Sequence, residues 1–255
     1  MRKSDIPRAW ALNVGMAFAL LTRLPLPRLP DDAFDRQADA VWAFPVVGLA
    51  IGGMAGMIGV AALALGLPAS VSAGLILAIQ IGVTGAMHED GLADTVDGLW
   101  GGWTRERRLE IMKDSAIGTY GVLALILSVG LRWMALAALL PLGIWPVIAA
   151  AALPRSLLPP LMAGLPHARD DGLSRRVGAP ARGPVAMALM FGLAIGWFAV
   201  GPAIVGAWLL AVALVLALAL LARSRIGGQT GDILGAAEQL GEIAVLLTLL
   251  AFAAS

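Results

Sequence analysis

Long runs of apolar residues divide the chain, and short polar or proline-containing stretches separate them. Within the runs, polar and apolar positions do not alternate, so the pattern predicts helices rather than the strands of a membrane barrel. Most runs approach the ~20 residues that a helix needs to cross a bilayer. In the first predicted span, which begins at Phe44, Gly48, Gly52 and Gly56 have the spacing that lets another membrane helix approach closely. Six spans are predicted, at Phe44–Gly66, Ala69–Met87, Gly118–Leu140, Leu142–Met162, Pro184–Gly201 and Ala203–Ala222.

The two ends of the chain modify this pattern. The stretch from Gly228 begins with polar turns and continues as an apolar run, which we count as a seventh span. The apolar run from Trp10 to Leu21 is only about half as long as a span, and no small-residue cleavage site follows it. We expect an interfacial or re-entrant helix over residues 10–22. The predicted fold class is all-α: a polytopic helical membrane protein with about seven transmembrane helices, forming a single integral-membrane catalytic domain over residues 1–255.

The composition supports a membrane protein. Of the 255 residues, 59% are hydrophobic and 14% are charged, whereas a soluble domain is about a quarter charged. The net charge of +1 gives no reason to expect a nucleic-acid partner. The long apolar runs make the lipid bilayer the expected surroundings. The chain has no cysteine, which excludes disulfides and thiolate ligands. With two histidines and one tyrosine, carboxylates are the main candidates for acid–base chemistry.

Charged residues fall on alternate connections between the predicted spans. Four regions hold all 17 acidic residues and every basic residue except Arg132 and Arg155: the N-terminal part, 88–117, 163–183 and 222–242. Three connections contain no charged residue, namely 67–68, 141–143 and 201–202. Alternating hairpins place the four charged regions on one side of the membrane, and the positive-inside rule predicts that this side is cytoplasmic. Arg132 lies nearer the far side, where we expect it to snorkel toward the surface.

A cluster of carboxylates follows the second predicted span. Nine residues contain four of them: Glu89, Asp90, Asp94 and Asp97. On a helix, Asp90, Asp94 and Asp97 lie at i, i+4 and i+7, so they share one face and repel one another. A hard divalent cation would neutralise that face, and carboxylate oxygens suit Mg²⁺. The pattern predicts a magnesium site, with a solvated acidic loop beside the membrane as the alternative.

A second acidic group begins the last predicted helix, and the topology brings it to the same surface. Asp232 stands at the helix start, where we weigh a simple N-cap equally with a catalytic role. Glu242 lies inside the apolar run, and a carboxylate there is costly and usually functional. We expect its cation to be Mg²⁺ or a lysine near the metal. The active site is therefore predicted to be shared between the second span and the last helix.

Basic residues stand near the same surface. The positive-inside rule accounts for most of them, but Lys113 lies tight against the third predicted span, and Arg155 lies in a span that prolines interrupt. Both are candidates to bind phosphate oxygens. A carboxylate–metal cluster ringed by cations at a membrane surface indicates phosphoryl or phosphodiester chemistry.

Five segments resemble the cobalamin synthase family, the adenosylcobinamide-GDP ribazoletransferases. The similar segments are FALLTRLPLP (18–27), WAFPVVGLAIG (42–52), HEDGLADTVDGLWGG (88–102), RERRLEIMKDSAIGTYGVLAL (105–125) and GGQTGDILGAAEQLGE (227–242). The resemblance implies a magnesium-dependent enzyme of the bacterial inner membrane with its active site facing the cytoplasm. Its substrates would be adenosylcobinamide-GDP and α-ribazole or its 5′-phosphate, and GMP would be released in the last step of cobalamin synthesis.

The resemblance also implies roles for individual residues. Mg²⁺ would be held by Asp90, Asp94 and Asp97, either Asp97 or Asp232 would accept the proton of the ribazole hydroxyl, and Lys113 and Arg155 would contact phosphate oxygens. His88 is a catalytic base or, equally, a structural residue at the membrane end of its helix. Supporting acidic residues would be Glu89, Asp114 and Glu242. At the position of Glu89 the family often has a hydrophobic residue.

Two other functions fit parts of the pattern. A CDP-alcohol phosphotransferase of phospholipid synthesis has a similar kind of acidic motif, but the spacing of its carboxylates differs. A transporter would carry polar residues near the bilayer midplane in both halves of an internal repeat. No repeat is visible and the charges gather on one side, which counts against transport. A homo-oligomer is compatible with the sequence.

Overall fold

The computed structural model describes residues 5–253, and the described chain is helical without any strand. This confirms the predicted fold class; residues 1–4 and 254–255 of the predicted domain lie outside the described residues. The helices in chain order are α1 (Asp5–Leu21), η1 (Asp31–Ala43), α2 (Phe44–Ala64), α3 (Ala69–Thr84), α4 (Met87–Gly101), α5 (Arg105–Ile111), α6 (Thr119–Leu139), η2 (Leu140–Leu142), α7 (Trp145–Ser156), α8 (Leu158–Gly164), α9 (Leu173–Val177), α10 (Arg182–Val200), α11 (Ala203–Ile226) and α12 (Gly231–Ala253).

Six helical segments in the described chain are long and apolar enough to cross a membrane. The pair α3 and α4 makes a seventh if it is counted as one broken span, because the two helices meet at an angle of 85°. Gly85 and Ala86 form the break, with φ angles of 65° and 59°. A left-handed residue after the last helical turn ends a helix, and glycine adopts that conformation without steric cost. The sequence predicted the acidic helix but not this turn.

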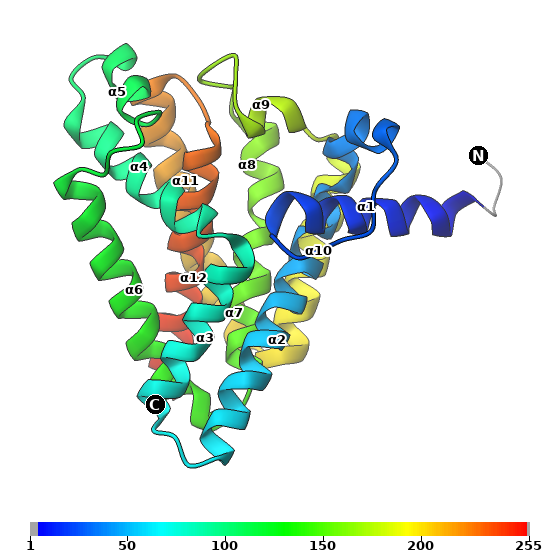
Figure 1. Ribbon diagram of the computed structural model, residues 1–255, viewed down its shortest axis with the longest axis vertical. Helices are drawn as coiled ribbons and strands as arrows, with labels where there is room; N and C mark the ends of the chain where they lie inside the picture. Colours follow the sequence, from blue (N-terminus) through cyan, green and yellow to red (C-terminus); the bar gives the residue numbers. More distant parts are fainter. Residues whose placement is uncertain (1–4, 254–255) are drawn as a thin grey trace.

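The helices pack closely around α7. Gly48, Gly52 and Gly56 of α2 face α7, and a methyl group added at Gly52 would lie 2.9 Å from the Cα of Ile148. The small-residue spacing in the first span therefore does allow a close helix contact, as predicted. Figure 1 shows α7 and α12 in the middle of the bundle, with α2, α6, α10 and α11 around them.

The charged segments gather at one end of the bundle. Figure 1 shows α5 and α9 at the top, whereas the α2–α3 turn and the carboxyl end of α12 lie at the bottom. The arginines at the end of α11 lie near α5, because the Arg108 guanidinium donates to the carbonyl of Arg225 at 3.1 Å. We call the top of this view the charged end. Helix α1 lies across the axis of α2 rather than alongside it, and Trp10 packs against Trp42 of η1.

Candidate active site

A cleft of about 470 Å³ opens at the charged end, between α4 and the connection from α5 to α6. It brings Glu89, Asp90 and Asp94 of α4 together with Lys113 and Asp114, so five residues of the predicted site share one cavity. The complete lining is Ala86, Glu89, Asp90, Ala93, Asp94, Met112, Lys113, Asp114, Ser115, Ile117 and Leu125.

Negative charge accumulates around Asp94. Asp90 is exposed and Asp94 is half-buried, and the carboxylates of Asp90, Asp232 and Asp97 all act electrostatically on Asp94, with Arg169 opposing them. In the described part of the chain, no group of three or more histidine, aspartate or glutamate side chains is arranged to hold a metal ion. Mg²⁺ commonly uses one or two carboxylates and completes its shell with water and substrate phosphates. The residues present therefore fit Mg²⁺ through Asp90 and Asp94 rather than through a closed protein cage.

Asp97 has a structural contact that the sequence did not predict. Its carboxylate is buried and accepts hydrogen bonds from the backbone N–H groups of Gly118 at 2.7 Å and Gly121 at 2.9 Å. Gly118 is the N-cap of α6 and Gly121 lies in its first turn, where backbone N–H groups have no partner within the helix. Asp97 thus caps α6 and ties α4 to it. Asp97 is not among the residues that line the cleft, and α6 engages both of its oxygens. Its assignment as a metal ligand or base therefore stays a prediction, to which this geometry adds no support.

Asp232 lies beside the acidic face of α4. The two helices touch at Gly91, where an added methyl group would lie 2.9 Å from the carbonyl oxygen of Asp232. The cap of α12 is Thr230, whose hydroxyl accepts from the N–H of Ile233 at 3.3 Å. The N-cap interpretation of Asp232 is therefore wrong, and its carboxylate is close enough to Asp94 to act on it electrostatically. The two acidic blocks meet in space, as the shared-site prediction requires.

Arg169 is a site residue that sequence reasoning did not single out. It lies on the connection from α8 to α9, and its guanidinium donates to Asp232 at 3.2 Å. The same connection carries Asp171, which accepts a hydrogen bond from the Lys113 ammonium. That contact lowers the pKa of the Asp171 carboxyl. In the sequence, Arg169 was one of four arginines that the positive-inside rule already explained, so no signal distinguished it.

The α8–α9 connection is anchored over the charged end. Arg105 donates to the carbonyls of Ala168 at 2.7 Å and Ile226 at 2.8 Å. The backbone of His167 pairs with that of Gln229, and the Gln229 amide donates to Met162 at 2.9 Å. These contacts hold Arg169 and Asp171 beside the acidic residues without requiring any regular secondary structure.

Arg132 is buried, contrary to the expectation that it snorkels. Only 1% of its side chain is exposed, and its guanidinium donates to Glu89 at 2.8 Å and to the Gln239 amide oxygen at 2.8 Å. It also pairs with Glu242 at 3.1 Å. The cation expected beside Glu242 is therefore Arg132, not Mg²⁺ or a lysine. One arginine of α6 thus joins α4 to α12.

Arg155 is also buried, and it does not reach the cleft. Its guanidinium pairs with Glu238 at 2.7 Å and donates to the carbonyl of Ala151 at 2.6 Å. Its side chain is 3% exposed. The predicted contact between Arg155 and a phosphate is not supported, because α12 places Glu238 against α7 where the guanidinium is needed to balance a buried charge.

His88 is not among the residues that line the acidic cleft. It lines a separate cavity of about 60 Å³ together with Ser174 and Gly231. The side chain is 3% exposed, and its Nε2 has no hydrogen-bond partner in the described chain. This position does not support a role for His88 as the base, and it agrees with the structural alternative.

Comparison with known proteins gives a consistent answer. Residues 13–250 match the family model described as cobalamin-5-phosphate synthase. A protein of Bradyrhizobium diazoefficiens named adenosylcobinamide-GDP ribazoletransferase is 50% identical over 94% of each chain. Proteins with the same name from a Sinorhizobium species and Rhizobium meliloti are each 42% identical, over 92% and 95% of this chain and 94% and 97% of their own. No solved structure matches the chain. The chain belongs to the cobalamin-5-phosphate synthase family.

Proposed function

We propose that the chain joins adenosylcobinamide-GDP to α-ribazole, or to its 5′-phosphate, and releases GMP in the last step of cobalamin synthesis. The supporting observation is the cleft in which Asp90, Asp94 and Lys113 lie together, in a chain whose relatives are named for this transfer. Carboxylates that hold a cation, next to a lysine, suit a reaction on a diphosphate.

The reaction replaces the phosphoanhydride bond of the diphosphate by a new phosphate ester bond. The ribazole hydroxyl oxygen attacks the cobinamide-side phosphorus, the bond from that phosphorus to the bridging oxygen breaks, and GMP leaves with the oxygen and its electron pair. The hydroxyl proton passes to a carboxylate. Of the two carboxylates considered, Asp97 has both oxygens engaged by α6, so we assign the base to Asp232. Arg169 and Thr230 hold one oxygen of Asp232 and orient the group.

The other residues bind and orient the diphosphate. Asp90 and Asp94 would hold Mg²⁺, which when bound neutralises the negative charge that develops in phosphoryl transfer. Lys113 would contact a phosphate oxygen through one of its three ammonium hydrogens, while another donates to Asp171. Asp114 accepts from the backbone N–H of Ala116 at 3.2 Å and thereby shapes the turn that presents Lys113.

The direct test is an assay of the purified protein in detergent with adenosylcobinamide-GDP, α-ribazole and Mg²⁺. We expect equal amounts of cobalamin product and GMP, with no reaction when a chelator removes the metal ion. The Bradyrhizobium relative, assayed in parallel, shows that the conditions support transfer. If the relative forms product and this chain forms none with either α-ribazole or its 5′-phosphate, the proposed function is refuted.

We propose further that the protein lies in the bacterial inner membrane with its charged end in the cytoplasm. The positive-inside rule supports this orientation. Because the chain has no cysteine, single cysteines at Thr104 and Leu65, both exposed, are labelled without background. In intact spheroplasts we expect an impermeant maleimide to label Leu65→Cys and to leave Thr104→Cys unlabelled until the membrane is opened. The reverse pattern would place the cleft outside the cell.

A further inference from the structure

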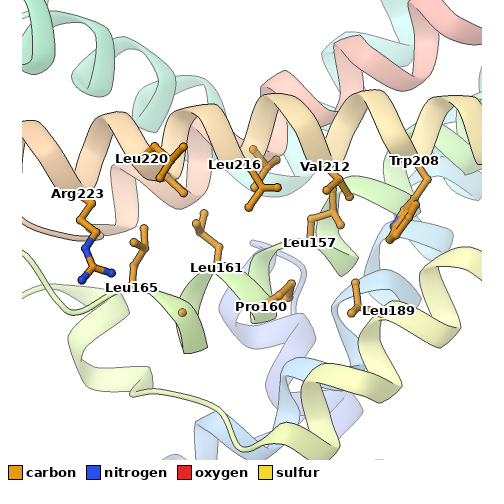
Figure 2. A pocket seen from close by; sticks show the side chains of 13 residues that line it. Leu157, Pro160, Leu161, Leu165, Leu189, Trp208, Val212, Leu216, Leu220 and Arg223 are labelled. Carbon is orange, nitrogen blue, oxygen red and sulfur yellow. The ribbon is translucent and has the colours of Figure 1, made fainter.

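An apolar groove of about 370 Å³ runs along α11, well away from the acidic cleft. Figure 2 shows Val212, Leu216 and Leu220 of α11 on one side, with Leu157, Pro160 and Leu161 on the other. Trp208 closes one end of the groove, and Leu189 of α10 lies beside it. Both α10 and α11 belong to the segments apolar enough to span a membrane. The groove is therefore a feature of the membrane-facing surface.

Arg223 is the one charged residue in the lining of the groove. It lies in the last turn of α11, at the charged end, and its side chain extends toward Leu165. Among the described residues it makes no ion pair and no side-chain hydrogen bond, unlike Arg225 two residues further on, which donates to the carbonyl of Leu99. A free guanidinium at the mouth of an apolar groove is complementary to a molecule with an anionic head and a hydrocarbon tail.

The dimensions of the groove favour a single hydrocarbon chain. From Trp208 to Arg223 the helix rises about 22 Å, because each residue adds about 1.5 Å. This exceeds half of the ~30 Å hydrocarbon core, so the groove spans the depth of one leaflet. A long, narrow apolar groove with one guanidinium at the charged end suits an acyl chain that carries an anionic headgroup.

We propose that this groove binds one anionic phospholipid, with an acyl chain along α11 and the lipid phosphate on Arg223. The phosphate oxygens accept hydrogen bonds from the guanidinium at the charged end, and the chain covers Leu216 and Leu220, which are 57% and 70% exposed. Leu165 at the mouth begins the connection that carries Arg169, so the lipid lies against the base of that connection. The site is separate from the substrate cleft and needs neither substrate nor metal.

Two substitutions test the two ends of this lipid site. Gly164 lines the groove, and a Cβ atom added there meets no atom within 4 Å, so we expect Gly164→Phe to place its ring in the groove while the backbone stays unchanged. Gly130→Phe is the matched control, because Gly130 in α6 has equally open space and lies outside the groove. Arg223→Gln removes the head contact, and Arg225→Gln removes the same charge two residues further along α11, from a side chain that does not line the groove.

Native mass spectrometry of the detergent-purified protein, titrated with phosphatidylglycerol or phosphatidylcholine, counts the bound lipids. We expect one phosphatidylglycerol per chain, held at least about tenfold more tightly than phosphatidylcholine, which corresponds to about 1.4 kcal/mol. Gly164→Phe should weaken both lipids about tenfold or more, and Arg223→Gln should remove the preference for phosphatidylglycerol. The two control variants should behave as the wild type.

Several results would overturn the lipid site. Equal affinity for the two lipids in the wild type would exclude the phosphate contact on Arg223. Unchanged binding in both Gly164→Phe and Arg223→Gln would place the lipid elsewhere, and a lipid-free dimer that Gly164→Phe disrupts would identify the occupant as a second copy. Since the titration contains no substrate, its failure leaves the transferase proposal untouched, and loss of transferase activity leaves the lipid site untouched.

Discussion

Replacing Arg132 by methionine is expected to destabilise the protein by about 3–5 kcal/mol, because it leaves buried carboxylates without their cation. Arg132 holds both Glu89 and Glu242, whose side chains are 10% and 2% exposed. The same guanidinium donates to Gln239, so one substitution removes the polar contacts by which α6 connects α4 and α12. The measurement is the midpoint of thermal unfolding in detergent, and activity should fall with it because α4 carries the acidic cleft.

Arg107 provides the control for this substitution. It pairs with Glu110 at 2.7 Å, but the two side chains are 59% and 69% exposed, so Arg107→Met should cost at most about 1 kcal/mol. Adding Glu242→Gln to Arg132→Met should recover part of the loss, because neutralising the carboxylate removes one uncompensated charge. Equal midpoints for Arg132→Met and Arg107→Met would mean that the buried pairs do not hold the helices together.

Replacing Asp94 by asparagine is expected to lower turnover by about 100-fold or more, since the loss of several kcal/mol of charge stabilisation corresponds to that factor. Asparagine keeps the volume of Asp94 and removes its charge. Without metal, the stability of this variant should stay the same or rise, because Asp90, Asp97 and Asp232 all repel the wild-type carboxylate. Activity should therefore fall without any loss of stability.

Two comparison variants make the Asp94 result specific. Asp97→Asn should lower the unfolding midpoint as well as the activity, because it weakens the cap of α6 by about 1 kcal/mol. Glu106→Gln removes a carboxylate from exposed α5 and should change neither quantity. Near-wild-type turnover of Asp94→Asn at ordinary Mg²⁺ concentrations would contradict the assignment of Asp94 to the cation site.

Much of the helix arrangement could be predicted from the apolar runs, because a span needs about twenty apolar residues and few segments satisfy that condition. The alternation of charged and uncharged connections likewise grouped the polar segments at one end, as Figure 1 shows. The right-angle break between α3 and α4 could not be predicted. It depends on the left-handed conformation of Ala86, which most non-glycine residues avoid and which only the packing of the whole bundle maintains.

The partners of the buried charged residues could not be predicted from the sequence either. The sequence shows that Arg132 and Arg155 lie outside the charged regions, but not which carboxylates they meet. Arg132 pairs with Glu242 and Arg155 with Glu238, both on α12 and far away in the chain. A helical face also predicts which residues point the same way, not which neighbour they meet. Asp97 shares the face of Asp94, yet the start of α6 reaches its carboxylate first.

The most direct test of the cation site measures Mn²⁺ binding to the purified protein by electron paramagnetic resonance. This measurement does not depend on turnover. Mn²⁺ suits the same oxygen ligands as Mg²⁺. With adenosylcobinamide-GDP present, the wild type should bind Mn²⁺ markedly more tightly than without it, because substrate phosphates complete the shell that Asp90 and Asp94 begin. Asp94→Asn should lose that tight binding, while Glu106→Gln should retain it. If Asp94→Asn binds Mn²⁺ as tightly as the wild type in the presence of the substrate, the carboxylates of the cleft do not hold the cation.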